Sequence, residues 1–180
     1  QVPRFAPAAG FVDRVMSHKR AGPLIAAARR EHHGYAVDPI TGLLLYSIPD
    51  IVTDHDEVGD LKFVGSVDIF EFNRQQFKEI WFMQLWFYNK VHCLITGVER
   101  KNNCFYIAVS DKYPHCVEVI ELDPKYEEMG EVLVRQGLTD LQEFLAEDPT
   151  ITNFEVWRKR SLQVKKIEPE YFMLNNDPRF

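Results

Sequence analysis

The run IWFMQLWFY, from Ile80 to Tyr88, contains a single polar residue, Gln84. A segment that is apolar on every side cannot face water, so this fold, a partner, a ligand or lipid must cover it. We expect a helix here, because Asn73 and the glutamine three residues later match a capping box that would open a helix through Lys90. The function of the chain therefore depends first on what covers this helix.

At helical spacing, one face of this helix accounts for only part of its apolar side chains. That face would pack on a sheet, and the remaining aromatic side chains would need a second cover. Three interpretations stay open: a helix internal to the domain, a docking surface, and a pocket for a flat cofactor or lipid. The internal helix is the simplest of these, and docking is the functional one, because tryptophan, phenylalanine and methionine are enriched at interface cores. The predicted interface consists of Trp81, Phe82, Met83, Trp86 and Phe87, with Arg4 and Phe5 near the N-terminus.

Hydrophobic periodicity predicts an α+β fold in which a mainly antiparallel sheet packs on this aromatic-rich helix. Three strands joined by short loops would form a central meander. The predicted strands are Leu43–Ile48, Leu61–Phe72, the three strands of the meander at Val91–Glu99, Cys104–Ser110 and Cys116–Leu122, and further strands at Val132–Arg135, Thr152–Lys166 and Tyr171–Leu174. A second capping box, Thr139 with Gln142, predicts a short helix through Leu145.

The two ends of the chain are predicted to lie outside the domain. Residues 1–12 contain two prolines and a glycine, so we expect an extended N-terminal arm. Short N-terminal helices follow in residues 13–32, interrupted near Gly22–Pro23 because proline removes a backbone donor. The single α+β domain would span residues 13–174, and residues 175–180 would form a C-terminal tail.

The charge of the chain is unevenly placed. The net charge of −6 argues against a nucleic-acid backbone bound over the whole surface, because phosphate contacts need a basic face. Residues 1–34 carry six basic and two acidic side chains, whereas the remainder carries 15 basic and 25 acidic ones. This basic front segment indicates a contact with something anionic, such as an acidic neighbouring subunit. We expect no direct nucleic-acid partner.

No catalytic residue, metal or cofactor is predicted. Three places have metal-ligand residue types, His92–Cys93, Cys104 and His115–Cys116, but the predicted meander holds the cysteines about 10–20 Å apart. The acidic loop Thr53–Asp60 does not match the calcium-loop pattern, so a solvated loop is favoured. The phosphate-binding, dinucleotide-binding, nucleophile-elbow and zinc-protease patterns do not occur in the sequence.

These observations lead to the hypothesis of a non-catalytic accessory subunit of a large assembly. The acid-poor, Ala- and Arg-containing start predicts a mitochondrial protein, or otherwise a cytoplasmic one, with a respiratory or ATP-synthase complex as the first expectation. A place beside a membrane complex is compatible with this hypothesis, but no transmembrane helix is expected, because Lys90 would lie near the centre of any span. Two alternatives stay open: an enzyme whose aromatic helix lines a flavin, haem or acyl pocket, and an organellar ribosomal protein.

Overall fold

The computed structural model describes residues 6–147 of the chain, with side-chain burial from Gly10 onward. The chain divides into two compact units, Gln1–Gln142 and Glu143–Phe180. The helices of the first unit are α1 (Ala6–Ser17), α2 (Ala21–Ala27), α3 (Ile69–Glu79), α4 (Trp81–Thr96) and α5 (Pro124–Glu147), the last of which continues into the second unit. Its strands are β1 (Arg29–Arg30), β2 (Gly34–Val37), β3 (Leu44–Ser47), β4 (Ile51–Val52), β5 (Val58–Val64), β6 (Cys104–Ser110) and β7 (Val117–Glu121).

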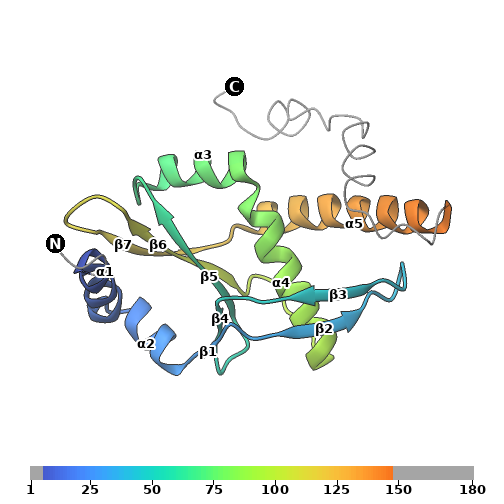
Figure 1. The fold of residues 1–180 in the computed structure, drawn as a ribbon, viewed down its shortest axis with the longest axis horizontal. Helices are drawn as coiled ribbons and strands as arrows, with labels where there is room; N and C mark the ends of the chain where they lie inside the picture. The colour runs from blue at the N-terminus through green and yellow to red at the C-terminus, as the bar shows by residue number, and fades with distance from the viewer. Residues whose placement is uncertain (1–5, 148–180) are drawn as a thin grey trace. The chain divides into compact units, whose positions relative to one another are not determined.

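The main sheet has five strands in the order β1-β4-β5-β6-β7, and β2 and β3 form a separate antiparallel hairpin (Figure 1). Three of the pairings in the main sheet are antiparallel, as expected. The central pair, β5 with β6, is parallel and is the longest ladder of the sheet. A parallel pair needs a crossover connection, and the helices α3 and α4 supply it. The structure is therefore a mixed α/β fold with a mostly antiparallel sheet.

Helices cover both faces of the main sheet. Because side chains alternate along a strand, β6 contributes Tyr106 and Ala108 to one face and Phe105, Ile107 and Val109 to the other. The first face packs against α3, α4 and α5, and we call it the α4 face. The second packs against α1 and α2, and we call it the α1 face. All seven residues of β6 are buried, which is typical of a strand covered on both faces.

The predicted helix from Asn73 to Lys90 is in fact two helices. The N-cap of α3 is Asp68, whose carboxylate accepts hydrogen bonds from the amides of Phe70 (3.0 Å) and Glu71 (3.2 Å). The expected capping box is wrong, because Gln76 instead donates from its side chain to that of Asn73 inside the helix. Ile80 has a left-handed backbone (φ 56°) and ends α3, so that α4 starts in a new direction.

The predicted meander is also wrong in its first strand. Residues 91–96 continue α4, which ends at Gly97 in the left-handed conformation. The β-branched residues in this segment favour a strand, but burial of Val91, His92 and Cys93 against the rest of the fold overrides that propensity. The strands predicted at Cys104–Ser110 and Cys116–Leu122 are confirmed as β6 and β7, and that at Leu43–Ile48 as β3.

Other boundaries differ as well. The strand predicted at Leu61–Phe72 is β5 displaced toward the N-terminus, since α3 already begins at Ile69. The strand at Val132–Arg135 and the short helix after it belong to one long helix, α5, in which the Thr139 hydroxyl donates to the Arg135 carbonyl. That helix is favoured by Pro124 at its first position and by the Asp123 carboxylate, which accepts from the Lys125 amide (2.8 Å).

At the N-terminus, α1 begins at Ala6, inside the range 1–12 that was expected to be an extended arm. The interruption expected at Gly22–Pro23 lies earlier, because these residues form the first turn of α2, where proline is tolerated. The strands expected at Thr152–Lys166 and Tyr171–Leu174 and the tail at residues 175–180 lie outside the described residues. None of the helices within 6–147 is long and apolar enough to cross a membrane.

Candidate carboxylate and lysine site

Strand β5 places two charged side chains on a face that is otherwise apolar. By the alternation of the strand, Val58, Asp60, Lys62 and Val64 share the α4 face, and the two valines are buried in its core. The side chain of Asp60 is 5% exposed and that of Lys62 is 16% exposed, with Nζ 2.7 Å from Asp60 Oδ2. Placing such a pair in the interior costs desolvation energy that burial of apolar residues would not.

A second carboxylate reaches the same strand from Asp50. This residue lies immediately before β4, and its Oδ2 accepts a hydrogen bond from the amide of Leu61 (2.8 Å). Strand β4 pairs with β5 over only two residue positions. The Asp50 side chain therefore lies just beyond the end of this pairing, along the same edge of β5. The backbone of Asp50 is held as well, since the amide of Glu31 donates to the Asp50 carbonyl (3.2 Å). Asp50 and Asp60 are thus brought together although nine residues separate them in the chain.

Helix α4 adds a polar pair on the other side of Lys62. Gln84 and Tyr88 lie four residues apart and therefore share one helix face. Gln84 Oε1 accepts from Lys62 Nζ (2.9 Å), and its amide Nε2 donates to the Tyr88 hydroxyl (2.7 Å). The ring of Trp81 lies 5.1 Å from the same Nζ, which adds a cation–π contact. The ammonium of Lys62 is therefore held in place by contacts with Asp60, Gln84 and Trp81.

Burial dominates the electrostatics of this cluster. Desolvation raises the pKa of Asp60, although the Lys62 ammonium opposes it, and the charge of Asp50 raises it further. Desolvation also raises the pKa of Tyr88; its bond with Gln84 opposes this change, and both carboxylates add to it. The charge of Asp50 therefore disfavours the ionisation of Asp60, and an additional cation at this place would favour the charged form of Asp60.

A buried oxygen atom beside this cluster has no hydrogen-bond partner in the described part of the chain. Asp60 Oδ2 is occupied by the Lys62 ammonium, whose Nζ lies 2.7 Å away. Tyr106, which pairs in register with Asp60 across the parallel ladder, is 1% exposed, and its hydroxyl lacks a hydrogen-bond partner among the described residues. Buried polar atoms of this kind are rare in folded proteins and call for a bound water, ion or ligand.

The donor set fits a hard divalent cation. Mg²⁺ prefers oxygen ligands and is usually held by one or two carboxylates, with waters and substrate phosphates completing its shell. Asp50 and Asp60 supply two such carboxylates, one that accepts from the Leu61 amide and one that is paired with the Lys62 ammonium. Within residues 6–147, no three His, Cys, Asp or Glu side chains gather closely enough to hold a metal by protein ligands alone. The arrangement therefore suits a metal that shares its coordination with a phosphate substrate.

The residues predicted as an interface lie in or near this region with differing burial. Phe82 (2% exposed) and Trp86 (8%) are buried, while Trp81, Met83 and Phe87 are half-buried. Phe82 packs in the α4-face core against Tyr126 of α5, and Trp81 lies beside Lys62. Arg4 and Phe5 lie outside the described residues. Docking through these side chains stays a prediction.

The sequence carries local signals for this site that the expectation of a non-catalytic protein leaves unexplained. In VGDLKFV, from Val58 to Val64, charges stand at alternate positions within an apolar strand, which predicts a buried charged pair. The lone glutamine in the apolar run at 80–88 likewise requires a polar partner. The interpretation of Thr53–Asp60 as a solvated acidic loop is wrong at its end, because Asp60 lies in β5 and is buried.

The other polar clusters noted in the sequence have structural roles. Asp56, in the acidic loop, accepts from Arg100 (2.8 Å) and contacts His92 Nε2 (3.2 Å). Cys93 lies on α4 rather than on a strand, so the register used to separate the cysteines does not exist. The Cys104 thiol is buried and donates to the Leu85 carbonyl, and desolvation raises its pKa well above the ordinary value.

Comparison with known proteins gives the fold but no family. No family model matches the chain, and no curated protein matches it. A crystal structure from Eubacterium rectale, described as a "Putative exonuclease", is similar with a TM-score of 0.58 at 13% sequence identity. The similarity covers 77% of this chain and 54% of that one, so the chain spans about half the length of the protein it matches. At this identity the likeness concerns the fold alone.

Proposed function

We propose that this chain is a divalent-metal-dependent hydrolase that cleaves phosphodiester bonds of nucleic acid. The observation that carries the proposal is the pair Asp60 and Lys62 on the apolar α4 face of β5, joined there by the carboxylate of Asp50. The name of the structural neighbour supports nucleic acid as the substrate class. The proposal departs from the sequence-based expectation of a non-catalytic protein without a nucleic-acid partner.

Each residue has a role that follows from its contacts. Asp50 and Asp60 would hold the metal, which when bound polarises a phosphoryl oxygen and lowers the pKa of a bound water. Lys62 presents a fixed positive charge, and a fixed cation lowers the energy of the negative charge that develops on phosphorus-bound oxygens during hydrolysis. Gln84, tied to Tyr88, fixes the position of that ammonium. The amide of Leu61 orients the Asp50 carboxylate.

The test is cleavage of fluorescently labelled single-stranded and double-stranded DNA and single-stranded RNA, with MgCl₂ or with EDTA. We expect Mg²⁺-dependent cleavage, and a loss of at least about 100-fold in Asp60→Asn and in Lys62→Ala, because fixed charges at such sites contribute several kcal/mol. Asp54→Asn, which changes an exposed carboxylate of the neighbouring loop, is the matched control and should retain full activity.

A second measurement separates metal binding from catalysis. Mg²⁺ that binds the folded chain raises its melting temperature by mass action. We expect this increase in the unaltered chain and in Lys62→Ala, but not in Asp60→Asn. Cleavage that persists in both variants, purified in parallel, would point to a contaminating nuclease and refute the assignment.

The accessory-subunit hypothesis stays a prediction, as does the mitochondrial location. Its support remains the aromatic run at residues 80–88, in which Trp81, Met83 and Phe87 keep partly exposed surface. The two proposals are compatible in principle, since a catalytic subunit also docks. Trp86→Asp is not a clean test of docking, because Trp86 is 8% exposed and packs close to Gly130 of α5. Phe87→Asp changes a less buried side chain and is the better variant for co-purification experiments.

A further inference from the structure

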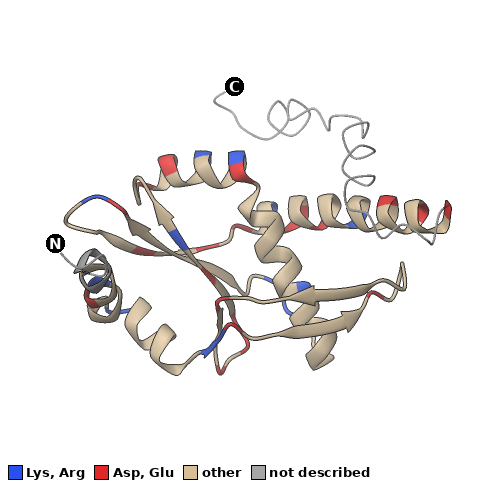
Figure 2. Ribbon diagram, viewed as in Figure 1, with Lys and Arg blue, Asp and Glu red and all other residues tan. Residues whose placement is uncertain are grey.

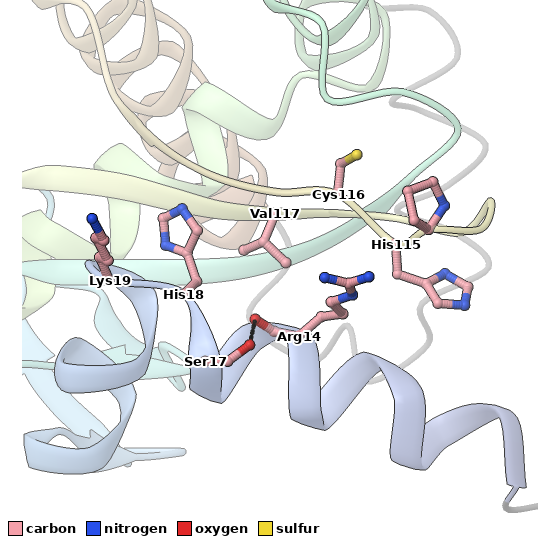
Figure 3. Close-up of a pocket in the computed structure, with 8 residues that line it drawn as sticks. Arg14, Ser17, His18, Lys19, His115, Cys116 and Val117 are labelled. Atoms are coloured by element: carbon pink, nitrogen blue, oxygen red, sulfur yellow. Dashed lines mark hydrogen bonds between the residues drawn. The ribbon is translucent and has the colours of Figure 1, made fainter.

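A hollow of about 390 Å³ lies between the end of α1 and the turn that joins β6 to β7 (Figure 3). It is open to solvent, and most of the side chains around it are exposed. Its lining comes from two segments far apart in the sequence: Arg14, Ser17, His18 and Lys19 on one side, and Pro114, His115, Cys116 and Val117 on the other. It belongs to the α1 face, because Val117 packs in that core, so it lies across the sheet from Asp60.

The lining of the hollow is basic. It contains two permanent cations, Arg14 and Lys19, together with two histidines, and none of the lining residues is acidic. Neither Arg14 nor Lys19 forms an ion pair within residues 6–147. Both α1 and the β6–β7 turn carry basic positions in Figure 2. Two cations that line one concave surface raise the local concentration of anions beside it, although the net charge of the chain is −6.

The two histidines are oriented by backbone contacts. His18 Nδ1 accepts from the amides of Ala21 (3.1 Å) and Arg20 (3.4 Å), which leaves the proton of the neutral ring on Nε2. His115 Nδ1 lies 3.2 Å from the carbonyl of Ser110 and donates to it. Its ring also stacks at a tilt on Phe11 of α1, with 4.2 Å between centroids. His18 is therefore a preset hydrogen-bond donor next to Arg14, and the contact between Phe11 and His115 holds the two sides of the hollow together.

We propose that this hollow binds a phosphate group, with Arg14 and Lys19 as the charged ligands and His18 Nε2 as a hydrogen-bond donor. Arginine suits this role, because its planar fork donates two parallel hydrogen bonds to phosphate oxygens. The inference rests on the proposed nuclease function for the source of the phosphate, which would be the backbone of the nucleic-acid substrate. It also gives a role to the basic front segment, whose anionic contact would then be substrate rather than an acidic subunit.

The test measures binding without cleavage. In the Asp60→Asn background with EDTA, anisotropy of a fluorescent single-stranded DNA is followed from 50 to 300 mM NaCl. Arg14→Gln with Lys19→Gln should weaken binding by roughly tenfold at low salt and reduce the slope of log K against log salt by about 1 to 2, as expected for two lost phosphate contacts. The control is Lys101→Gln with Lys125→Gln, which removes the same charge from exposed residues near the opposite end of β6.

Inorganic phosphate serves as the second probe. At matched ionic strength, phosphate should raise the melting temperature of the unaltered chain and of the control variant relative to chloride. It should not do so in the variant that lacks both Arg14 and Lys19. Equal losses of DNA binding in the double variant and the control would mean general charge attraction and would overturn the site. A different outcome would separate the two proposals. If phosphate and DNA binding depend on Arg14 and Lys19 but the unaltered chain shows no Mg²⁺-dependent cleavage, the phosphate site is supported and the nuclease function is refuted.

Discussion

Replacing Asp38 should destabilise the fold by several kcal/mol, because its buried carboxylate has partners in two elements. Asp38 lies after β2, and its side chain is completely buried. Its Oδ2 accepts from the amide (2.9 Å) and the hydroxyl (2.8 Å) of Thr41, and its Oδ1 accepts from Arg135 of α5 (2.6 Å). One carboxylate therefore closes the turn of the β2–β3 hairpin and joins it to the longest helix.

The magnitude depends on the groups that each variant leaves without a partner. Removing one member of a buried ion pair costs about 3–5 kcal/mol, and the 23% exposure of Arg135 places this case near the lower end. The Thr41 amide, in a residue only 8% exposed, also loses its acceptor, at a cost of about 1 kcal/mol. We therefore expect Asp38→Ala to lower the free energy of unfolding by about 3–4 kcal/mol. Asp38→Asn keeps an acceptor for Thr41 and should lose only about 1–2 kcal/mol.

Urea unfolding followed by circular dichroism measures these differences, and the melting temperature should fall by roughly 2–4 °C per kcal/mol. Arg135→Ala and the double variant complete a thermodynamic cycle, which should give a coupling energy above about 1 kcal/mol for residues in direct contact. A coupling energy near zero, or an Asp38→Ala variant as stable as Asp38→Asn, would refute the reasoning.

The same residue sets a pH dependence. Desolvation by itself would raise the pKa of Asp38, but the bonds from the Thr41 amide, Arg135 and the Thr41 hydroxyl together lower it below its ordinary value of 3.8. A carboxyl group with a lowered folded-state pKa contributes stability that is fully present above its unfolded pKa and is lost as pH falls through the folded one. The stability difference between the unaltered chain and Asp38→Asn should therefore be constant near neutral pH and shrink below about pH 4.

Three further outcomes follow from packing. Gly130→Ala should destabilise the fold by about 1–3 kcal/mol, because the added Cβ would lie 2.8 Å from Trp86 Cβ. Gly137→Ala, in the same helix, places its Cβ where nothing lies within 4 Å and should stabilise the fold by about 0.5–1 kcal/mol. Equal effects of the two variants in urea unfolding would contradict this. Tyr106→Phe removes a buried hydroxyl that has no partner within the described part of the chain and should raise stability by about 1 kcal/mol, and a loss of that size would mean that the hydroxyl is satisfied. Of the three cysteines, exposed Cys116 should react with a thiol reagent in the native state, while buried Cys93 and Cys104 should react only on unfolding, as peptide mapping of the labelled protein would show.

Local patterns in the sequence predict the parts of the fold whose cause is local. The strand at 104–110 is apolar along its whole length, and the turn at Asp38–Gly42 is set by side-chain chemistry that the sequence displays. The prediction for segment 91–99 is wrong because its β-branched residues favour a strand in isolation, while its helical form depends on packing with the β2–β3 hairpin. The long helix α5 is missed for a related reason, since its stabilising contacts with Phe82 and Trp86 come from α4.

The site is hard to predict because its parts converge only through tertiary structure. Asp60 and Lys62 lie two positions apart, and that much is readable in the sequence. The approach of Asp50 depends on how β4 ends against β5, and the approach of Gln84 depends on the corner at Ile80. Neither leaves a periodic pattern in the chain. The hollow between α1 and the β6–β7 turn is harder still to predict, because its two sides lie about a hundred residues apart.

The parallel pairing of β5 with β6 has a consequence for how the chain matures. Gln84 and Tyr88 lie on helix α4, which connects these two strands. They can contact Lys62 only when this connection has folded and the β5–β6 ladder has formed. Long-range closure of this kind is slow relative to local helix or hairpin formation. Until β6 has paired with β5, the chain therefore lacks the contacts of Gln84 that hold the Lys62 ammonium, and the proposed activity would appear only after this step.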